Sequence, residues 1–459
     1  MSMRRRTVRS YEIDMCNGPL FGKIVLFAVP LMLSGILQLL FNAADVVVVG
    51  KFAGHESLAA VGATTSLVNL LINVFIGLSV GANVLVARYY GGQHLKDLEE
   101  TIHSTMLLAL IGGMILIVLG VGLTPPLLRL MGTPENILPL SVLYLRIIFI
   151  GMPVTLIYNF GAAILRGVGD TRRPLYFLST AGIINVILNL IFVIKFSMGV
   201  AGVALATILS QCISAVLIVQ CLMRSDTYYR LQLRKLRLVP EKVREIVRIG
   251  VPAGLQGAIF SVSNVLIQSS INSFGDIAMA GNTAASSIEG FVYSGMNAVY
   301  QTALSFTSQN FGAKQFQRMT KILLYCLGLV TVVGLVLGNG VVLLGPLLIS
   351  IYNDNPEVIA YGVLRLKIIG SAYFICGVMD TMVGALRGMG YSMVPMFVSL
   401  TGACAFRVIW IFTVFAMYRS LETLYISYPV SWIITAAAHV VCYVVIRKKM
   451  GRTQVEISK

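Results

Sequence analysis

A series of long apolar stretches is the feature that most constrains how this chain folds. Between residues 22 and 446, about twelve stretches approach the roughly 20 residues that cross a lipid bilayer as a helix. Hydrophobic residues make up 57% of the chain and charged residues only 12%, far below the roughly 25% of soluble domains. The sequence therefore predicts an all-α polytopic membrane protein with twelve transmembrane helices.

Lysine and arginine gather on one side of the predicted spans. The loops on the other side carry only Lys51, Arg129, Lys195 and Arg419. Because loops rich in these residues stay in the cytoplasm, both termini are predicted to be cytoplasmic. The same rule accounts for the formal net charge of +16, so we expect a lipid bilayer and no nucleic acid as partner.

The second half of the chain repeats the first. LRGVGDTRRP at 165–174 returns as LRGMGYSMVP at 386–395, and VLYLRII at 142–148 returns as VLRLKII at 363–369. Further matches at a nearly constant offset are Pro30, Gly35, Asn42 and Phe52 with Pro252, Gly257, Asn264 and Phe274. Two collinear repeats, each with an even number of spans, predict two six-helix bundles in the same orientation.

These boundaries divide the chain into five parts. We expect a cytoplasmic tail at 1–21, an N-terminal bundle at 22–222, a basic cytoplasmic linker at 223–248, a C-terminal bundle at 249–446 and a cytoplasmic tail at 447–459.

One carboxylate, Asp45, lies inside the first span. A charge at mid-membrane costs about 2.5 to 3.5 kcal/mol on insertion scales, so an acid there is a functional candidate. Gln38, Asn42 and Asp45 share one stripe of the predicted helix, which must face protein or water. In the second repeat Asp45 aligns with Ile267, so the acid belongs to one bundle only.

Three further residues of the N-terminal bundle are candidate partners of Asp45. Asn185 and Asn189 are one turn apart on the fifth span, and Thr207 on the sixth offers a hydroxyl. Their oxygens, with the carboxylate, suit Na+. A carboxylate held away from water could instead carry a proton. The alternatives are that Asp45 only bonds a neighbouring helix and that the asparagines only join helices.

The C-terminal bundle contains two acids within its spans, Glu289 and Asp380. They are candidates for a second titratable or cation-attracting site. The alternatives are that Glu289 is hydrated near a helix end and that Asp380 pairs with a basic group. Further polar residues within the spans are predicted to line the transport cavity, namely Gln38, Asn42, Asn159, Asn264, Gln268, Asn297 and Gln301.

The remaining chemistry-bearing residues form no recognisable centre. The seven cysteines include no CxxC pair, and the four histidines no HxxxH pair, so we expect no metal site, disulfide framework or cofactor. The sequence contains no GxSxG or HExxH motif. It is not predicted to be an enzyme.

The chain resembles the multidrug and toxic compound extrusion (MATE) family over about residues 20–447. The resemblance rests on the paired LRGxG motifs, the duplication, PLMLSGILQLLFNAADVVVVGKFAG at 30–54 and MGVAGVALAT at 198–207. It implies a V-shaped antiporter that expels cationic or amphipathic compounds in exchange for Na+ or H+. It also implies that Asp45, Asn185 and Thr207 take part in ion coupling. The motifs favour the DinF-like branch over the Na+-linked branch, although Asn189 stands where the DinF-like branch often has an acid.

A lipid-linked oligosaccharide flippase of the same superfamily is the alternative function. Such a protein needs a strongly basic central cavity, and the helix cations Arg146, Arg365, Lys367 and Arg407 are not predicted to gather at a centre. We therefore expect a transporter of small molecules in the bacterial cytoplasmic membrane, functional as a monomer, with no cofactor besides its coupling ion.

Overall fold

The computed structural model describes residues 11–457, and within them the chain is helical without a β-strand. The first ten residues of the predicted N-terminal tail and the last two of the C-terminal tail lie outside the described residues. The predicted all-α membrane fold is confirmed.

The chain divides into two compact units. Unit 1 comprises the chain up to Thr64, Ala82–Arg244 and Ser308–Arg318, and unit 2 comprises Thr65–Gly81, Glu245–Thr307 and the chain from Met319 onward. Each unit therefore contains a short segment from the other half of the sequence.

The helices of the N-terminal half are long, and one of them continues into a π-helical segment. Their bounds are α1 (Leu20–Phe52), α2 (His55–Gly91), α3 (Leu95–Leu130), α4 (Leu138–Ile150), α5 (Met152–Gly167), α6 (Arg172–Asn189) with its π-helical continuation η1 (Leu190–Lys195), and α7 (Gly199–Met223).

The C-terminal half contains three π-helical segments. After the short 3-10 turn η2 (Leu233–Lys235) come α8 (Pro240–Asn272), α9 (Asp276–Gly312), α10 (Phe316–Leu343), α11 (Gly345–Ser350), α12 (Pro356–Arg365), η3 (Leu366–Gly370), α13 (Ser371–Gly388), α14 (Met393–Ser399), η4 (Leu400–Ala405), α15 (Phe406–Trp410), η5 (Ile411–Phe415) and α16 (Leu421–Ile457).

The helices have the length and composition of membrane spans. Within residues 11–457, ten helices are long and apolar enough to cross a bilayer, and the bent pair α4 and α5 raises this to eleven. Apolar side chains such as Val118 (71% exposed) and Phe412 (76% exposed) point outward, as lipid contact requires. The 37-residue α9 also has the length of a span, but Asn282, Glu289 and Asn297 lower its hydropathy.

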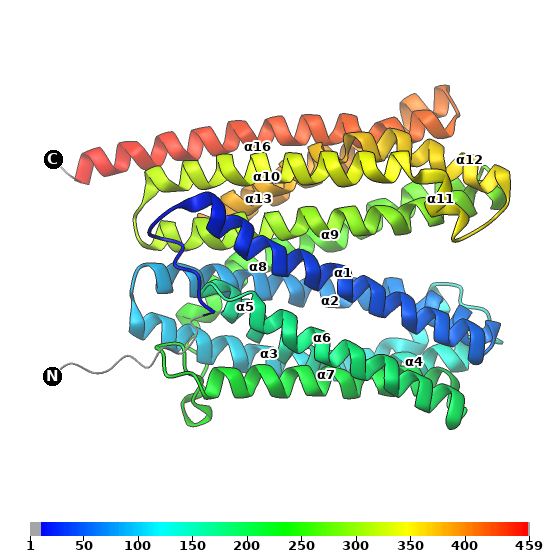
Figure 1. The fold of residues 1–459 in the computed structure, drawn as a ribbon, viewed down its shortest axis with the longest axis horizontal. Helices are drawn as coiled ribbons and strands as arrows, with labels where there is room; N and C mark the ends of the chain where they lie inside the picture. The colour runs from blue at the N-terminus through cyan, green and yellow to red at the C-terminus, as the bar shows by residue number, and fades with distance from the viewer. Residues whose placement is uncertain (1–10, 458–459) are drawn as a thin grey trace. The chain divides into compact units, whose positions relative to one another are not determined.

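In unit 1, α1 packs against α6, and α6 against α7, as Figure 1 shows. A glycine permits this approach, since a Cβ built on Gly182 would lie 1.8 Å from the ring of Phe41. Small residues at such crossings let helix backbones come close. The crossing lies about one turn from Asp45 on α1 and one turn from Asn185 on α6, so it sets the spacing of the polar groups.

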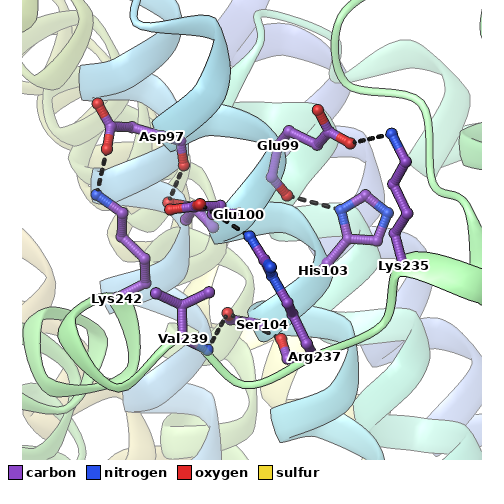
Figure 2. A network of polar contacts seen from close by, with 10 residues as sticks. Asp97, Glu99, Glu100, His103, Ser104, Lys235, Arg237, Val239 and Lys242 are labelled. Carbon is purple, nitrogen blue, oxygen red and sulfur yellow. Dashed lines mark hydrogen bonds and ion pairs between the residues drawn. The ribbon is translucent and has the colours of Figure 1, made fainter.

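The linker between the halves is held to the start of α3 by ion pairs and hydrogen bonds (Figure 2). Lys235 Nζ lies 2.8 Å from Glu99 Oε1, and Arg237 Nη2 lies 3.0 Å from Glu100 Oε1. The buried His103 accepts a hydrogen bond from the backbone N–H of Gln232 at 3.1 Å.

The first turns of α8 continue the same network. Lys242 Nζ lies 2.6 Å from Asp97 Oδ1, and the backbone N–H of Val239 donates to Ser104 Oγ at 3.0 Å. Tyr229 and Leu231 add buried apolar contacts to the core of unit 1. The linker is thus an ordered part of this unit.

Candidate functional site

The acid predicted from the first span has one of its predicted partners beside it. Asn189 Nδ2 donates a hydrogen bond to Asp45 Oδ1 at 2.5 Å and lies 3.4 Å from Asn185 Oδ1. Asn189 and Asn185 are buried, and Asp45 is half-buried. Asp45 thus forms one polar cluster with the two asparagines of α6, which we call the Asp45 cluster.

The Asp45 cluster contains one unpartnered amide oxygen and a carboxylate without a basic partner. Among the described residues, Asn189 Oδ1 is buried without a hydrogen-bond partner, and no Lys, Arg or His forms an ion pair with Asp45. A half-buried carboxylate within a membrane span and without a counter-ion is energetically costly, because the low-dielectric surroundings screen its charge poorly. A proton or a small cation would remove that cost.

Asn189 lies at a change in helix geometry. It is the last residue of α6, and the π-helical segment η1 begins directly after it. A π-helical turn contains an additional residue, which shifts the side chains that follow out of phase with those before it, and such segments are frequent at functional sites. The Asn189 side chain therefore lies where the regular α-helical face of α6 ends.

Thr207 lies on the neighbouring helix α7 but has a different partner. Its hydroxyl donates to the backbone carbonyl of Val203 at 3.0 Å, one turn earlier. Within the part of the chain that the structure describes, no hydrogen bond joins it to Asp45. Its role in coupling stays a prediction.

The two acids of unit 2 have different surroundings. Glu289 is 4% exposed and forms a two-pronged ion pair with Arg365, with N–O distances of 2.9 and 2.7 Å. Asn282 accepts a third bond from Arg365 at 2.6 Å. The charge of Glu289 is therefore compensated by Arg365, and Glu289 is not a hydrated acid near a helix end. Asp380 lines the larger of two neighbouring cavities of unit 2 and interacts electrostatically with Arg387.

That larger cavity has a volume of about 510 Å³ and lies within unit 2, so we call it the unit 2 cavity. Asn264 and Asn297 line it, and Asn264 and Gln268 line a neighbouring cavity of about 310 Å³. Gln301 donates to Asn297 Oδ1 at 2.9 Å. Four of the predicted cavity residues thus lie at or beside these two cavities.

The remaining three predicted cavity residues lie in unit 1. Gln38 and Asn42 are exposed on α1, and Asn159 donates to the backbone carbonyl of Thr155 at 3.0 Å. Their part in a transport cavity stays a prediction.

Sequence reasoning missed the role of three arginines. Arg387 and Arg407 line the unit 2 cavity and Arg365 lines its smaller neighbour, so the expectation that helix cations do not gather was wrong for this unit. Arg365 directly precedes η3, and Arg407 lies between η4 and η5. The signal that could have revealed Arg365 and Arg407 is the one that singled out Asp45, a charge within an apolar run.

The all-helical fold, the apolar spans and the internal polar groups define a multi-pass membrane transporter. The sequence profile of the MatE family matches the chain twice, at residues 30–191 and 252–413, and the chain belongs to this family. The two matches also agree with the duplication. Because members of this family are transporters, the chain is a transporter and not an enzyme.

Relatives of known name support the same class. The chain is 27% identical over 420 residues to the probable multidrug resistance protein YoeA of Bacillus subtilis, covering 89% of this chain and 90% of that protein. It is 25% identical over 375 residues to an FAD transporter of Shewanella oneidensis, with 80% and 82% coverage.

The fold is also that of a solved transporter. An outward-facing structure of a multidrug resistance MATE family transporter superposes with a TM-score of 0.89 at 22% identity, covering 95% of this chain and 98% of that chain. The fold of the whole chain is therefore that of a MATE transporter.

Proposed function

We propose that this protein is a cation-coupled antiporter that exports cationic or amphipathic small molecules by alternating access of its two bundles. The observation that carries the proposal is the Asp45 cluster, a carboxylate with neighbouring carboxamides and no basic partner among the described residues. The multidrug resistance function named for YoeA supports the substrate class.

The geometry supports a chemical account of coupling. The Asn189 N–H group donates to the Asp45 carboxylate. If Na+ binds, rotation of the Asn189 amide turns its unpartnered oxygen toward the ion, beside the oxygens of Asp45 and Asn185. If a proton binds, it neutralises Asp45 directly and weakens the hydrogen bond from Asn189. Either ion removes the uncompensated charge.

We propose that the protein works as a monomer in the bacterial cytoplasmic membrane, with both termini in the cytoplasm and no cofactor beyond the coupling ion. In that orientation the membrane potential contributes to export, since each inward cation charge releases roughly 2.3 kcal/mol per 100 mV.

The decisive experiment measures transport of a fluorescent cation in proteoliposomes under separately imposed Na+ and pH gradients. One gradient should drive transport in the wild type, and Asp45→Asn should reduce it to background under both. Asp380→Asn serves as the comparison variant, because it neutralises the half-buried acid of unit 2.

Thermal unfolding verifies that Asp45→Asn still folds, which we expect because the change removes a costly buried charge. Transport by Asp45→Asn at the wild-type rate would refute the coupling role. Transport that persists without any ion gradient would refute antiport itself.

A further inference from the structure

The unit 2 cavity carries an excess of positive charge. Of its 22 lining residues, three are formally charged at neutral pH, namely Asp380, Arg387 and Arg407. One acid against two arginines leaves one uncompensated positive charge in a cavity whose volume lies within the range for drug-sized ligands, roughly 300 to 1,000 Å³. The question is which arginine remains without a partner.

Arg387 has more partners within the protein than Arg407. Its Nη1 donates to Tyr300 Oη and its Nη2 to Gln256 Oε1, both at 2.8 Å, while its Nε is buried without an acceptor among the described residues. The Asp380 carboxylate lines the same cavity and interacts electrostatically with Arg387, without forming an ion pair within 4.0 Å. The adjoining acid Glu289 is already committed to Arg365.

Arg407 is the arginine without a counter-charge. It is 3% exposed, and its Nε donates to Ser431 Oγ at 2.9 Å. Within residues 11–457 its Nη2 is buried without an acceptor, and no carboxylate lies within 4.0 Å of the guanidinium. Such a group is costly, and an oxyanion that accepts from Nη2 would satisfy both its charge and its hydrogen bond.

Aromatic side chains lie beside this guanidinium. Arg407 Cζ is 4.2 Å from the ring centroid of Tyr428 and 5.8 Å from that of Trp432. The Tyr373 and Trp432 rings lie 5.4 Å apart, and both line the cavity. Rings of this kind bind planar apolar groups.

We propose that the unit 2 cavity binds aromatic amphipathic compounds that carry one oxyanion such as a carboxylate, with the oxyanion at Arg407 and the ring system against Tyr373, Tyr428 and Trp432. This inference rests on the proposed export function and narrows the substrate class of this cavity to amphipathic anions, so a cationic export substrate would not bind at Arg407. Binding itself requires no ion gradient and is measured separately.

Three pyrene probes with the same ring and different end groups test the proposal: pyrenebutyrate (anionic), pyrenebutanol (neutral) and pyrenebutylamine (cationic). The chain contains two tryptophans, so Trp410→Phe leaves Trp432 as the only energy donor to pyrene. Saturable energy transfer from Trp432 in detergent solution then reports both affinity and location.

We expect pyrenebutyrate to bind about tenfold more tightly than pyrenebutanol, a typical value for one charged hydrogen bond, and pyrenebutylamine to bind weakest. Arg407→Gln should remove the preference for butyrate while leaving pyrenebutanol affinity nearly unchanged. Arg407→Lys should retain part of it. The control Arg146→Gln removes an exposed arginine from a helix of unit 1 and should change nothing.

An Arg407→Gln protein that keeps the preference overturns the assignment of Arg407. Equal or reversed affinities in the Arg407-containing protein, or no saturable transfer from Trp432, overturn the anionic ligand class, even if the variant does not fold. Because no gradient is applied, a protein that fails to couple transport to an ion can still pass this test, and a coupled exporter can still fail it.

Discussion

The two units hold unpaired charges of opposite sign. In unit 1 the Asp45 carboxylate accepts a hydrogen bond from a carboxamide and has no basic partner among the described residues, whereas in unit 2 the Arg407 guanidinium donates to a hydroxyl and lies against aromatic rings. Asn189, the partner of Asp45, directly precedes the π-helical segment η1, and Arg407 lies between η4 and η5. The difference teaches that the two repeats share a scaffold but differ in the sign of their unpaired charge.

The aligned positions support this divergence. When the two repeats are aligned, Asp45 aligns with Ile267, and Asn189 aligns with Trp410. In the opposite direction, Arg407 aligns with Val186 and Arg365 with Tyr144. At the aligned positions, each repeat therefore lacks the unpaired charged side chain that the other repeat has.

The largest effect should come from breaking the buried ion pair between Glu289 and Arg365. Glu289→Gln leaves Arg365 buried without its counter-ion, which typically costs about 3 to 5 kcal/mol. Thermal unfolding in detergent should show a large decrease in Tm. Asp45→Asn, which removes an unpaired acid, should show no comparable decrease.

The double variant Glu289→Gln/Arg365→Gln serves as a further control, since it removes both charges and should recover much of the lost stability. Equal Tm decreases for Glu289→Gln and Asp45→Asn would show that the two acids do not differ in the way the structure indicates.

The crossing of α1 and α6 should tolerate no added methyl group. Gly182→Ala places a Cβ in the ring of Phe41 and should destabilise the protein by about 1 to 3 kcal/mol. The matched change Gly328→Ala, on α10 with no atom within 4 Å of the added Cβ, should be neutral or slightly stabilising. Tm changes of opposite sign are the expected result, and equal changes would argue against a tight crossing.

A smaller effect is expected from removing the donor to Asp45. Asn189→Leu keeps the approximate volume but deletes a hydrogen bond that stabilises the ionised Asp45 carboxylate, so a coupling proton should bind about tenfold more tightly. If Na+ is the coupling ion, the loss of the amide oxygen should instead weaken its apparent affinity. Ion-concentration dependence of transport in proteoliposomes measures it. Asn339→Leu is the matched control, because Asn339 is exposed and bonds only its own helix. An unchanged ion dependence in Asn189→Leu would remove Asn189 from the cluster's function.

The smallest effect should come from an exposed linker charge. Lys235→Ala breaks a pair whose side chains are 54% and 39% exposed, and such pairs contribute about 0 to 1 kcal/mol. Unfolding at low and high salt should differ little between this variant and the wild type. A decrease in stability as large as that of Glu289→Gln would mean that burial does not determine how much a charged side chain contributes to stability here.

Sequence patterns predicted the spans, the duplication and the intramembrane acids. Because polar groups are costly in lipid, spans are apolar stretches, and an acid within one is easily recognised. The same reasoning identified Asn189 as a candidate partner of Asp45 from helical spacing and repeat comparison. It did not identify Arg387, since an arginine before glycines at a helix end has an adequate structural explanation.

By itself, the sequence determined that this protein is a duplicated helical membrane protein in which only one repeat has an acid in its first span. Hydropathy and residue identity are sufficient for these conclusions, since both are read directly from the sequence and require no knowledge of contacts between distant segments. Only the tertiary structure decided which charges are paired: Glu289 forms an ion pair with Arg365, whereas Asp45 and Arg407 have no counter-ion within 4.0 Å among the described residues. Charge pairing depends on distances of a few ångströms between segments that are far apart in the sequence, and local sequence patterns do not give those distances.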